Sequence, residues 1–132
     1  SFSQQSQRYV SEENFDYVIP PTIQANQAAL ERFQNLMEEI RKAYGELQEL
    51  GIPKQDARFV LPNAVTSEIV ISANLREWRH IFSVRCEQAA QWEIRTICIQ
   101  MLELLQKAVP TVFSDFVIDK DRMVAKKVAL ED

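Results

Sequence analysis

A helical repeat of apolar side chains runs from residue 23 to residue 50. Gly51 suits the left-handed conformation that ends many helices, and Pro53 cannot continue one. The pattern therefore predicts one amphipathic helix from Ile23 to Leu50, and the fold has to be built around it. The apolar positions follow one another at intervals of three and four, which places them on one helix face: Leu30, Phe33, Met37, Ile40, Tyr44 and Leu47.

Shorter elements flank this helix. Aromatic and branched residues favour extended segments at residues 8–10 and 15–19, the second of which ends at a Pro-Pro pair. Residues 53–57 have the character of a short helical turn. Within residues 66–73, a branched run predicts a buried strand: Ile69, Val70 and Ile71.

Two further helices are expected in the second half of the chain. Asn74 and Glu77 have the spacing of a capping box, in which the Asn side chain accepts a hydrogen bond from the third amide of the helix. This helix is expected to run to Arg85. Another is expected from Ala90 to Ala108, with its apolar residues at helical spacing: Ile94, Ile97, Cys98, Met101, Leu104 and Leu105.

The end of the chain is expected to hold a short helix and a hairpin. Pro110 can open a helix that bears Phe113 and Phe116, and residues 118–132 suit a small hairpin around Asp119. Because no internal repeat or linker is evident, residues 1–132 are expected to form a single unit. The fold class is therefore α+β and helix-rich, with long amphipathic helices and a small mixed sheet.

Composition narrows the classes of function. The net charge of -4 has the wrong sign for coating nucleic acid or acidic lipid. No stretch of about 18 uncharged apolar residues is present to cross a membrane, and the polar start does not resemble a signal peptide, so a cytoplasmic protein is expected. Cys86 and Cys98 lie twelve residues apart in helical sequence, which favours reduced thiols over a disulfide or a zinc site. Since His80 is the only histidine, no metal site is expected.

The helix that follows Asn74 has a cationic side. Arg76, Arg79 and His80 share this side on a helical wheel, which suits a phosphate or an electron-rich ring, although a solvated surface gives the same pattern. Arg85 falls on the opposite, apolar side. Because a guanidinium cannot lose its charge, Arg85 either binds an anion or carbonyl oxygens there, or reaches solvent where the helix ends. The apolar side consists of Leu75, Trp78, Ile81 and Phe82.

A nucleophilic cysteine is poorly supported. Arg85 would favour a thiolate at Cys86, but His80 lies about 240° away around the helix and cannot act as its base. The other soft and aromatic side chains at helical spacing are expected to be packing residues: Met37, Trp92, Cys98 and Met101.

The first nine residues form a polar strip. Six hydroxyl or amide side chains and Arg8 lie between Ser1 and Tyr9, with no glycine or proline. Neutral donors around one positive charge suit a phosphorylated, amide-bearing ligand, while a frayed polar terminus is the simpler alternative.

This strip resembles the second half of the signature of flavin-dependent thymidylate synthases, R-H-R-x-x-S-x-N-x-x-S-x-R. Ser1, Ser6 and Arg8 stand at the two serines and the final arginine, whereas Ser3 and Gln4 depart from the commoner Asn-Glu. Later blocks resemble the same family in order and spacing: Ala57-Arg58-Phe59-Val60-Leu61-Pro62-Asn63, Asn74-Leu75-Arg76-Glu77-Trp78-Arg79-His80, Val84-Arg85 and Gln91-Trp92-Glu93-Ile94-Arg95.

The resemblance covers nearly all of the chain and implies a function. The family methylates dUMP to dTMP, with methylenetetrahydrofolate as carbon donor, NADPH as reductant and FAD as cofactor, in a homotetramer whose active sites lie between subunits. The chain would be the C-terminal portion, without the family's N-terminal half, and inactive by itself. The alternative is a non-catalytic helical scaffold or interaction fragment, suggested by the long helix at residues 23–50.

The resemblance also assigns site residues. Arg85 matches the catalytic arginine that activates dUMP, and Arg58 matches an arginine that contacts dUMP from another subunit. Ala89 stands where the family often has a histidine near the flavin and folate. The dUMP site would comprise Gln4, Gln5, Ser6, Gln7, Arg8, Arg58 and Arg85, and the FAD site Gln4, Asn74, Leu75, Arg76 and His80.

Overall fold

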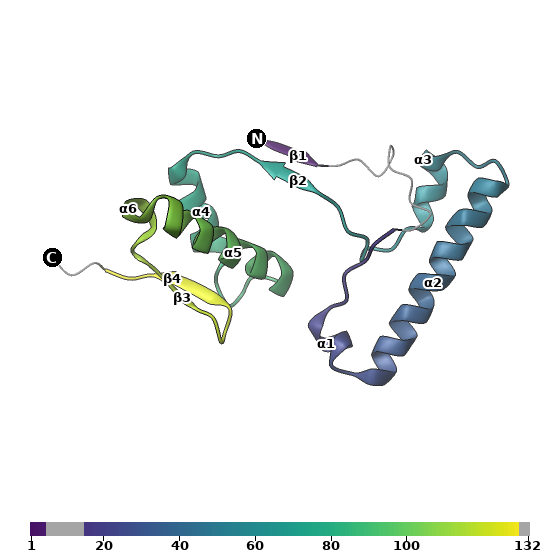
Figure 1. The fold of residues 1–132 in the computed structure, drawn as a ribbon, viewed down its shortest axis with the longest axis horizontal. Coiled ribbons are helices and arrows are strands. Elements are labelled where there is room, and N and C mark those ends of the chain that lie inside the picture. The colour runs from purple at the N-terminus through teal and green to yellow at the C-terminus, as the bar shows by residue number, and fades with distance from the viewer. Residues whose placement is uncertain (5–14, 130–132) are drawn as a thin grey trace. The chain divides into compact units, whose positions relative to one another are not determined.

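The computed structural model describes residues 1–4 and 15–129, which belong to two compact units, Ser1–Ile71 and Ser72–Asp132 (Figure 1). The extended segment expected at residues 8–10 lies outside the described part of the chain. The expectation that residues 1–132 form one unit stays a prediction. None of the helices in the described ranges combines the length and the apolar character that crossing a bilayer requires.

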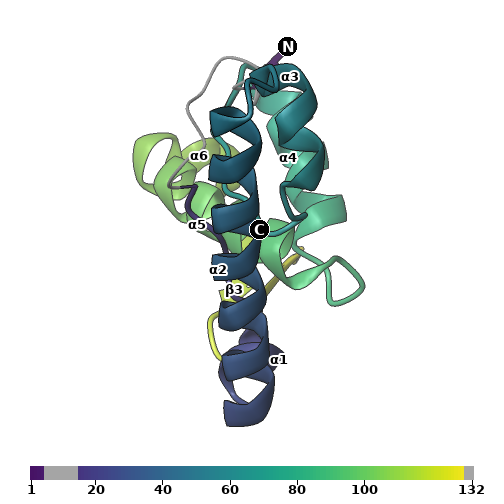
Figure 2. The ribbon, with the colours of Figure 1, turned by 90° about the vertical axis from the view of Figure 1, so that its right-hand side faces the viewer.

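The long helix of the first unit is α2, Gln27–Glu49, and it is preceded by the short helix α1, Pro21–Gln24. Figure 2 shows α2 as one uninterrupted helix with α1 at its lower end. The expected start at Ile23 is wrong, because Asn26 adopts an extended conformation and its Oδ1 accepts a hydrogen bond from Ala29 N–H at 3.1 Å. The end is as expected, with Gly51 at φ +82°.

The buried side of α2 packs against an extended segment. Phe15 is 3% exposed, and its carbonyl accepts a hydrogen bond from Arg41 Nη2 at 2.8 Å. The Arg41 guanidinium also lies 5.2 Å from the Phe15 ring centroid. Tyr17 and Val65 form an antiparallel bridge, which confirms extended structure within residues 15–19. After α2 come α3, Lys54–Ala57, and the 3-10 turn η1, Arg58–Val60.

A two-stranded antiparallel ribbon also belongs to this unit. It consists of β1, Phe2–Gln4, and β2, Ile69–Ile71, with Phe2 opposite Ile71 and Gln4 opposite Ile69. The expected strand is present, but its expected burial is wrong, since Ile69 is 51% and Val70 67% exposed. A ribbon of two strands has no second layer to cover its branched side chains, and such ribbons are marginally stable by themselves.

Up to residue 129, where its described part ends, the second unit consists of three helices and a hairpin. Its helices are α4, Leu75–Arg85, α5, Trp92–Ala108, and α6, Pro110–Phe113. The hairpin pairs β3, Phe116–Asp119, with β4, Val124–Lys127, which confirms the hairpin expected around Asp119. The expectation that Phe116 lies on the short helix is wrong, because α6 ends at Phe113. The α+β class is confirmed, and the described strands form two separate antiparallel pairs where one mixed sheet was expected.

An aromatic core holds the second unit together. Phe82 of α4 is fully buried and contacts the rings of Phe113 and Phe116 at centroid distances of 5.7 and 6.2 Å. The hairpin is joined to the end of α4 by a hydrogen bond of 2.9 Å from Ala125 N–H to the Cys86 carbonyl. The other buried members of this core are Cys98, Ile99 and Leu102.

The apolar residues of α5 do not all face this core. Cys98 is 1% exposed, as expected for a packing residue, whereas Ile94, Ile97 and Leu104 are 37, 44 and 66% exposed. Only part of the apolar stripe expected on this helix is therefore buried, because the apolar arc of α5 is wider than the core that α4, α6 and the hairpin provide.

Candidate functional site

The start of α4 forms the first part of the candidate site. Asn74 is extended, and its Oδ1 accepts a hydrogen bond from Glu77 N–H at 2.8 Å, which confirms the expected cap. Leu75 is 42% exposed, and the side chains of Arg76 and His80 are also exposed. Residues four apart lie on the same side of a helix, so Arg76 and His80 offer two cationic or hydrogen-bonding groups side by side.

We expect Asn74→Ala to lower the free energy of unfolding by about 1 kcal/mol, because the first turn of α4 loses its side-chain acceptor. Chemical denaturation followed by circular dichroism measures this change. The matched control is Asn74→Ser, since serine is also a good cap. If the alanine and serine variants unfolded at the same denaturant concentration, the cap would not stabilise α4.

Arg79 is not part of an open cationic side, which corrects the expectation from the helical wheel. Its Nη1 and Nη2 donate to the two carboxylate oxygens of Asp115 at 2.7 and 2.6 Å, and Nη1 also donates to the Val112 carbonyl. The hydrogen bond from Arg79 lowers the pKa of Asp115. The sequence gives no signal for Asp115, because a partner 36 residues away lies outside any helical periodicity.

Arg85 is the last residue of α4 and is exposed. Of the two alternatives left open by the sequence, this chain shows the one in which the guanidinium reaches solvent where the helix ends. Cys86 follows Arg85 as the C-cap, so the helix ends where the guanidinium reaches solvent. Burial raises the pKa of Cys98, and the positive charge of Arg85 partly offsets this increase.

Both cysteines are unsuited to nucleophilic chemistry. Cys86 and Cys98 are free thiols, and burial raises the pKa of Cys86 to about 12. The expectation of two free thiols is confirmed, and so is the expectation that Cys98 is a packing residue. No cluster of metal-binding side chains occurs in the described ranges.

We therefore expect neither thiol to react readily with a thiol-specific reagent at pH 8. Below the raised pKa of Cys86, the reactive thiolate is scarce, and the protein interior also excludes the reagent. Absorbance of the released chromophore measures the rate, with protein in denaturant as the control that reacts fully. Rapid labelling of the native protein would contradict the burial of this pair.

The remaining assigned residues belong to the first unit or lie outside the described part of the chain. Gln4 ends β1 opposite Ile69. Arg58 is half-buried, and its Nε donates to the Gln55 carbonyl at 3.0 Å while its guanidinium lies 5.8 Å from the exposed Phe59 ring. Those outside the described residues are Gln5, Ser6, Gln7 and Arg8.

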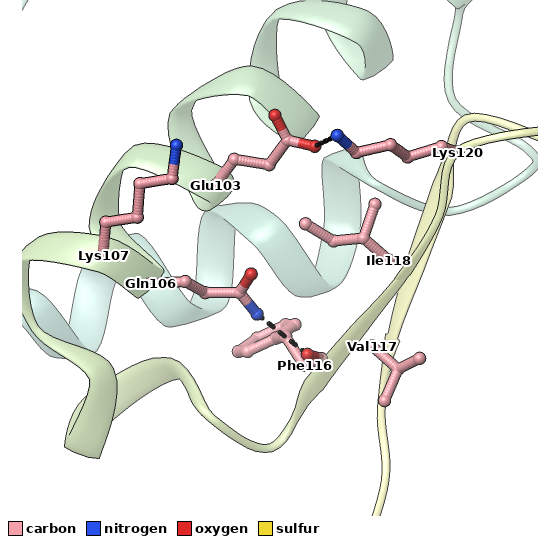
Figure 3. A pocket seen from close by; sticks show the side chains of 7 residues that line it. All are labelled: Glu103, Gln106, Lys107, Phe116, Val117, Ile118 and Lys120. Carbon is pink, nitrogen blue, oxygen red and sulfur yellow. Dashed lines mark hydrogen bonds and ion pairs between the residues drawn. The ribbon is translucent and has the colours of Figure 1, made fainter.

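A shallow pocket beside α5 contains none of the assigned residues. It lies where Glu103 and Gln106 project from α5 toward β3 (Figure 3). Lys120 pairs with Glu103 at 3.0 Å, and Gln106 Nε2 donates to the Phe116 carbonyl at 2.9 Å. The polar groups of this pocket mainly bind one another, so the exposed side of α4 remains the stronger candidate.

Comparison with known proteins agrees with the motif blocks. The family model described as "Thymidylate synthase complementing protein" matches residues 1–111. A "Flavin-dependent thymidylate synthase" from Geobacter sulfurreducens is 43% identical over 117 residues, which cover 87% of this chain and 50% of the relative. Proteins of the same name from Nitratidesulfovibrio vulgaris and Pyrococcus abyssi are each 45% identical, over 86 and 81% of this chain and 50 and 46% of the relatives.

The chain thus spans about half the length of these curated relatives. The matched region includes β1, both long helices and the exposed side of α4, and it stops before the hairpin. On this evidence, the chain belongs to the family of thymidylate synthase complementing proteins.

Proposed function

We propose that this chain is the C-terminal portion of a flavin-dependent thymidylate synthase. The complete enzyme converts dUMP to dTMP, with methylenetetrahydrofolate and NADPH as co-substrates, and acts as a homotetramer in the cytoplasm. The observation that carries the proposal is the side of α4 where Asn74, Arg76 and His80 are all exposed. This side lies in the region that matches the family model.

The exposed side of α4 has the chemistry that FAD requires. Arg76 and His80 offer donors for a diphosphate, and the half-exposed Leu75 offers an apolar contact for a ring. Asn74 begins the helix beside them, and we assign Gln4 to the same ligand. When bound, FAD supplies hydride transfer, which no side chain can perform. The protein's part is to orient the ligands and to balance their charge.

We assign dUMP to a second set of residues. Ser6 and Arg8 would bind its phosphate, and the neighbouring amides its base. Arg85 would face an oxygen of the uracil ring, where a permanent positive charge stabilises negative charge on the ring and makes carbon 5 more nucleophilic. The residues of this set are Gln4, Gln5, Ser6, Gln7, Arg8, Arg58 and Arg85.

Exposed apolar surface in the first unit supports assembly with further protein. Phe59, next to Arg58, is 81% exposed, and Val70 of β2 is 67% exposed. Large apolar side chains in solvent favour association. Arg58 beside such a surface suits the proposed contact with dUMP of another subunit.

The test is dTMP formation by the full-length protein, together with flavin absorbance of the purified sample. We expect a yellow protein that makes dTMP only when dUMP, methylenetetrahydrofolate and NADPH are all present. We expect residues 1–132 alone to make none, because half of the family's length is missing. A colourless full-length protein without this activity would refute the proposal, and dTMP from the 132-residue chain would refute its incompleteness.

The alternative function is a helical scaffold. It is favoured by the exposed apolar residues of the α2 region, Leu36 at 39% and Leu50 at 77%. A scaffold would keep binding its protein partner after Arg85→Ala and would ignore dUMP. Loss of dTMP formation in that variant would favour the enzyme.

A further inference from the structure

Arg79 joins the middle of α4 to the segment that connects α6 with β3. Its guanidinium makes two parallel hydrogen bonds to Asp115, a third to the Val112 carbonyl, and lies 5.2 Å from the Phe116 ring centroid. The side chains of Arg79 and Asp115 are only 29 and 20% exposed. A bidentate ion pair fixes the plane of the guanidinium as well as its position.

The partner of Arg79 is itself held in place. The Asp115 carbonyl accepts a hydrogen bond of 2.8 Å from Val128 N–H. On the other side, Gln106 Nε2 of α5 donates to the carbonyls of Phe113 and Phe116 at 3.2 and 2.9 Å. Val128 and Gln106 therefore hold the backbone on either side of Asp115, whereas Arg79 binds the Asp115 carboxylate itself.

Arg79 lies between the buried and the exposed sides of α4. On a helix of about 100° per residue, Arg76 lies roughly 60° and His80 about 100° from Arg79 in one direction. The buried Phe82 lies about 60° away in the other direction. A side chain fixed at this boundary sets the rotation of the helix about its own axis.

We propose that Arg79 is a positioning residue, whose pairing with Asp115 holds α4 in the rotation that presents Arg76 and His80 together to the flavin. The inference rests on the proposed function, because it takes this side of α4 as the flavin site. The raised pKa of Arg79, caused first by its hydrogen bond to Asp115, is consistent with a persistent pair.

The test compares three variants of the full-length protein. Arg79→Lys keeps the charge but loses the bidentate geometry, and Asp115→Asn keeps the shape but loses the charge. The matched control is Gln106→Leu, which breaks two hydrogen bonds to the same connecting segment from α5 and leaves the Arg79 pair intact. The measurements are the Kd for FAD by fluorescence titration, amide hydrogen exchange in α4, and the Tm.

We expect Arg79→Lys and Asp115→Asn each to raise the Kd for FAD about tenfold and to speed exchange in α4. The double variant is expected to bind FAD only slightly more weakly than either single variant, because both substitutions remove the same interaction between residues 79 and 115. Gln106→Leu should lower the Tm by about as much as Asp115→Asn does, but should change the Kd for FAD less than about twofold.

Two results would overturn the inference. One is a control variant that weakens FAD binding as much as Asp115→Asn at equal Tm, which would make the pair merely structural. The other is Arg79→Lys with unchanged Kd and unchanged exchange. A wild-type protein that binds no flavin would instead refute the proposed function, and the exchange rates alone would then show whether Arg79 holds α4.

Discussion

Replacing Arg85 with alanine in the full-length protein should lower the rate of dTMP formation by at least about a hundredfold, the usual effect of removing a group that stabilises developing charge. The proposed role of Arg85 is to stabilise negative charge on the uracil ring, and alanine cannot do this. The fold should change little, because Arg85 is exposed at the end of α4 and makes none of the described hydrogen bonds of the core. We therefore expect kcat to fall while the Tm stays close to that of the wild type.

Steady-state kinetics with dUMP as the varied substrate measures this prediction. Arg32→Ala is the matched control, since Arg32 is an exposed arginine on α2 without an assigned role. Arg85→Lys separates charge from geometry: lysine restores a positive charge but not the planar guanidinium, so we expect only partial recovery. Wild-type kcat in the alanine variant would remove Arg85 from the proposed mechanism.

Phe82→Ala should have the largest effect on stability, with a loss of about 3 to 5 kcal/mol of unfolding free energy. Phe82 is 0% exposed and lies at the centre of the aromatic core, with the rings of Trp78 and Phe113 each 5.7 Å from its own. Removing the ring leaves a cavity that rigid aromatic neighbours fill poorly. Since small domains are stable by only about 5 to 15 kcal/mol, this loss removes a large share of the unfolding free energy.

Urea unfolding followed by tryptophan fluorescence measures this loss, because Trp78 reports directly on the core. Phe82→Leu is the control and should lose less than half as much, since leucine fills most of the space. An alanine variant that unfolds at the wild-type urea concentration would mean that Phe82 is not the centre of the core.

Local sequence signals predicted most elements, because each signal acts within one turn of helix. Asn74 caps α4 as expected, and Gly51 ends the helical run as expected. Asn26 was overlooked because its neighbours continue the apolar periodicity, yet its own side chain is a better partner for the Ala29 amide than a further helical turn.

Features that depend on distant partners could not be predicted in this way. The helical wheel places Arg79 on the same side as Arg76, but the Arg79 guanidinium is paired with the carboxylate of Asp115 and is therefore not open to a ligand. The branched run of β2 predicts a strand correctly, whereas its burial depends on protein that would have to pack on the ribbon. Arg85 reaches solvent where the helix ends, which is one of the two alternatives that the sequence left open.

The hydrogen bond from Ala125 N–H to the Cys86 carbonyl determines where the chain can be shortened. It ties the last strand to the residue just after Arg85, although the family model stops at residue 111. The strand β4 thus stabilises the C-terminal end of α4. Removing the residues after 122 would remove this hydrogen bond, and we expect the last turn of α4, which bears Arg85, to fray.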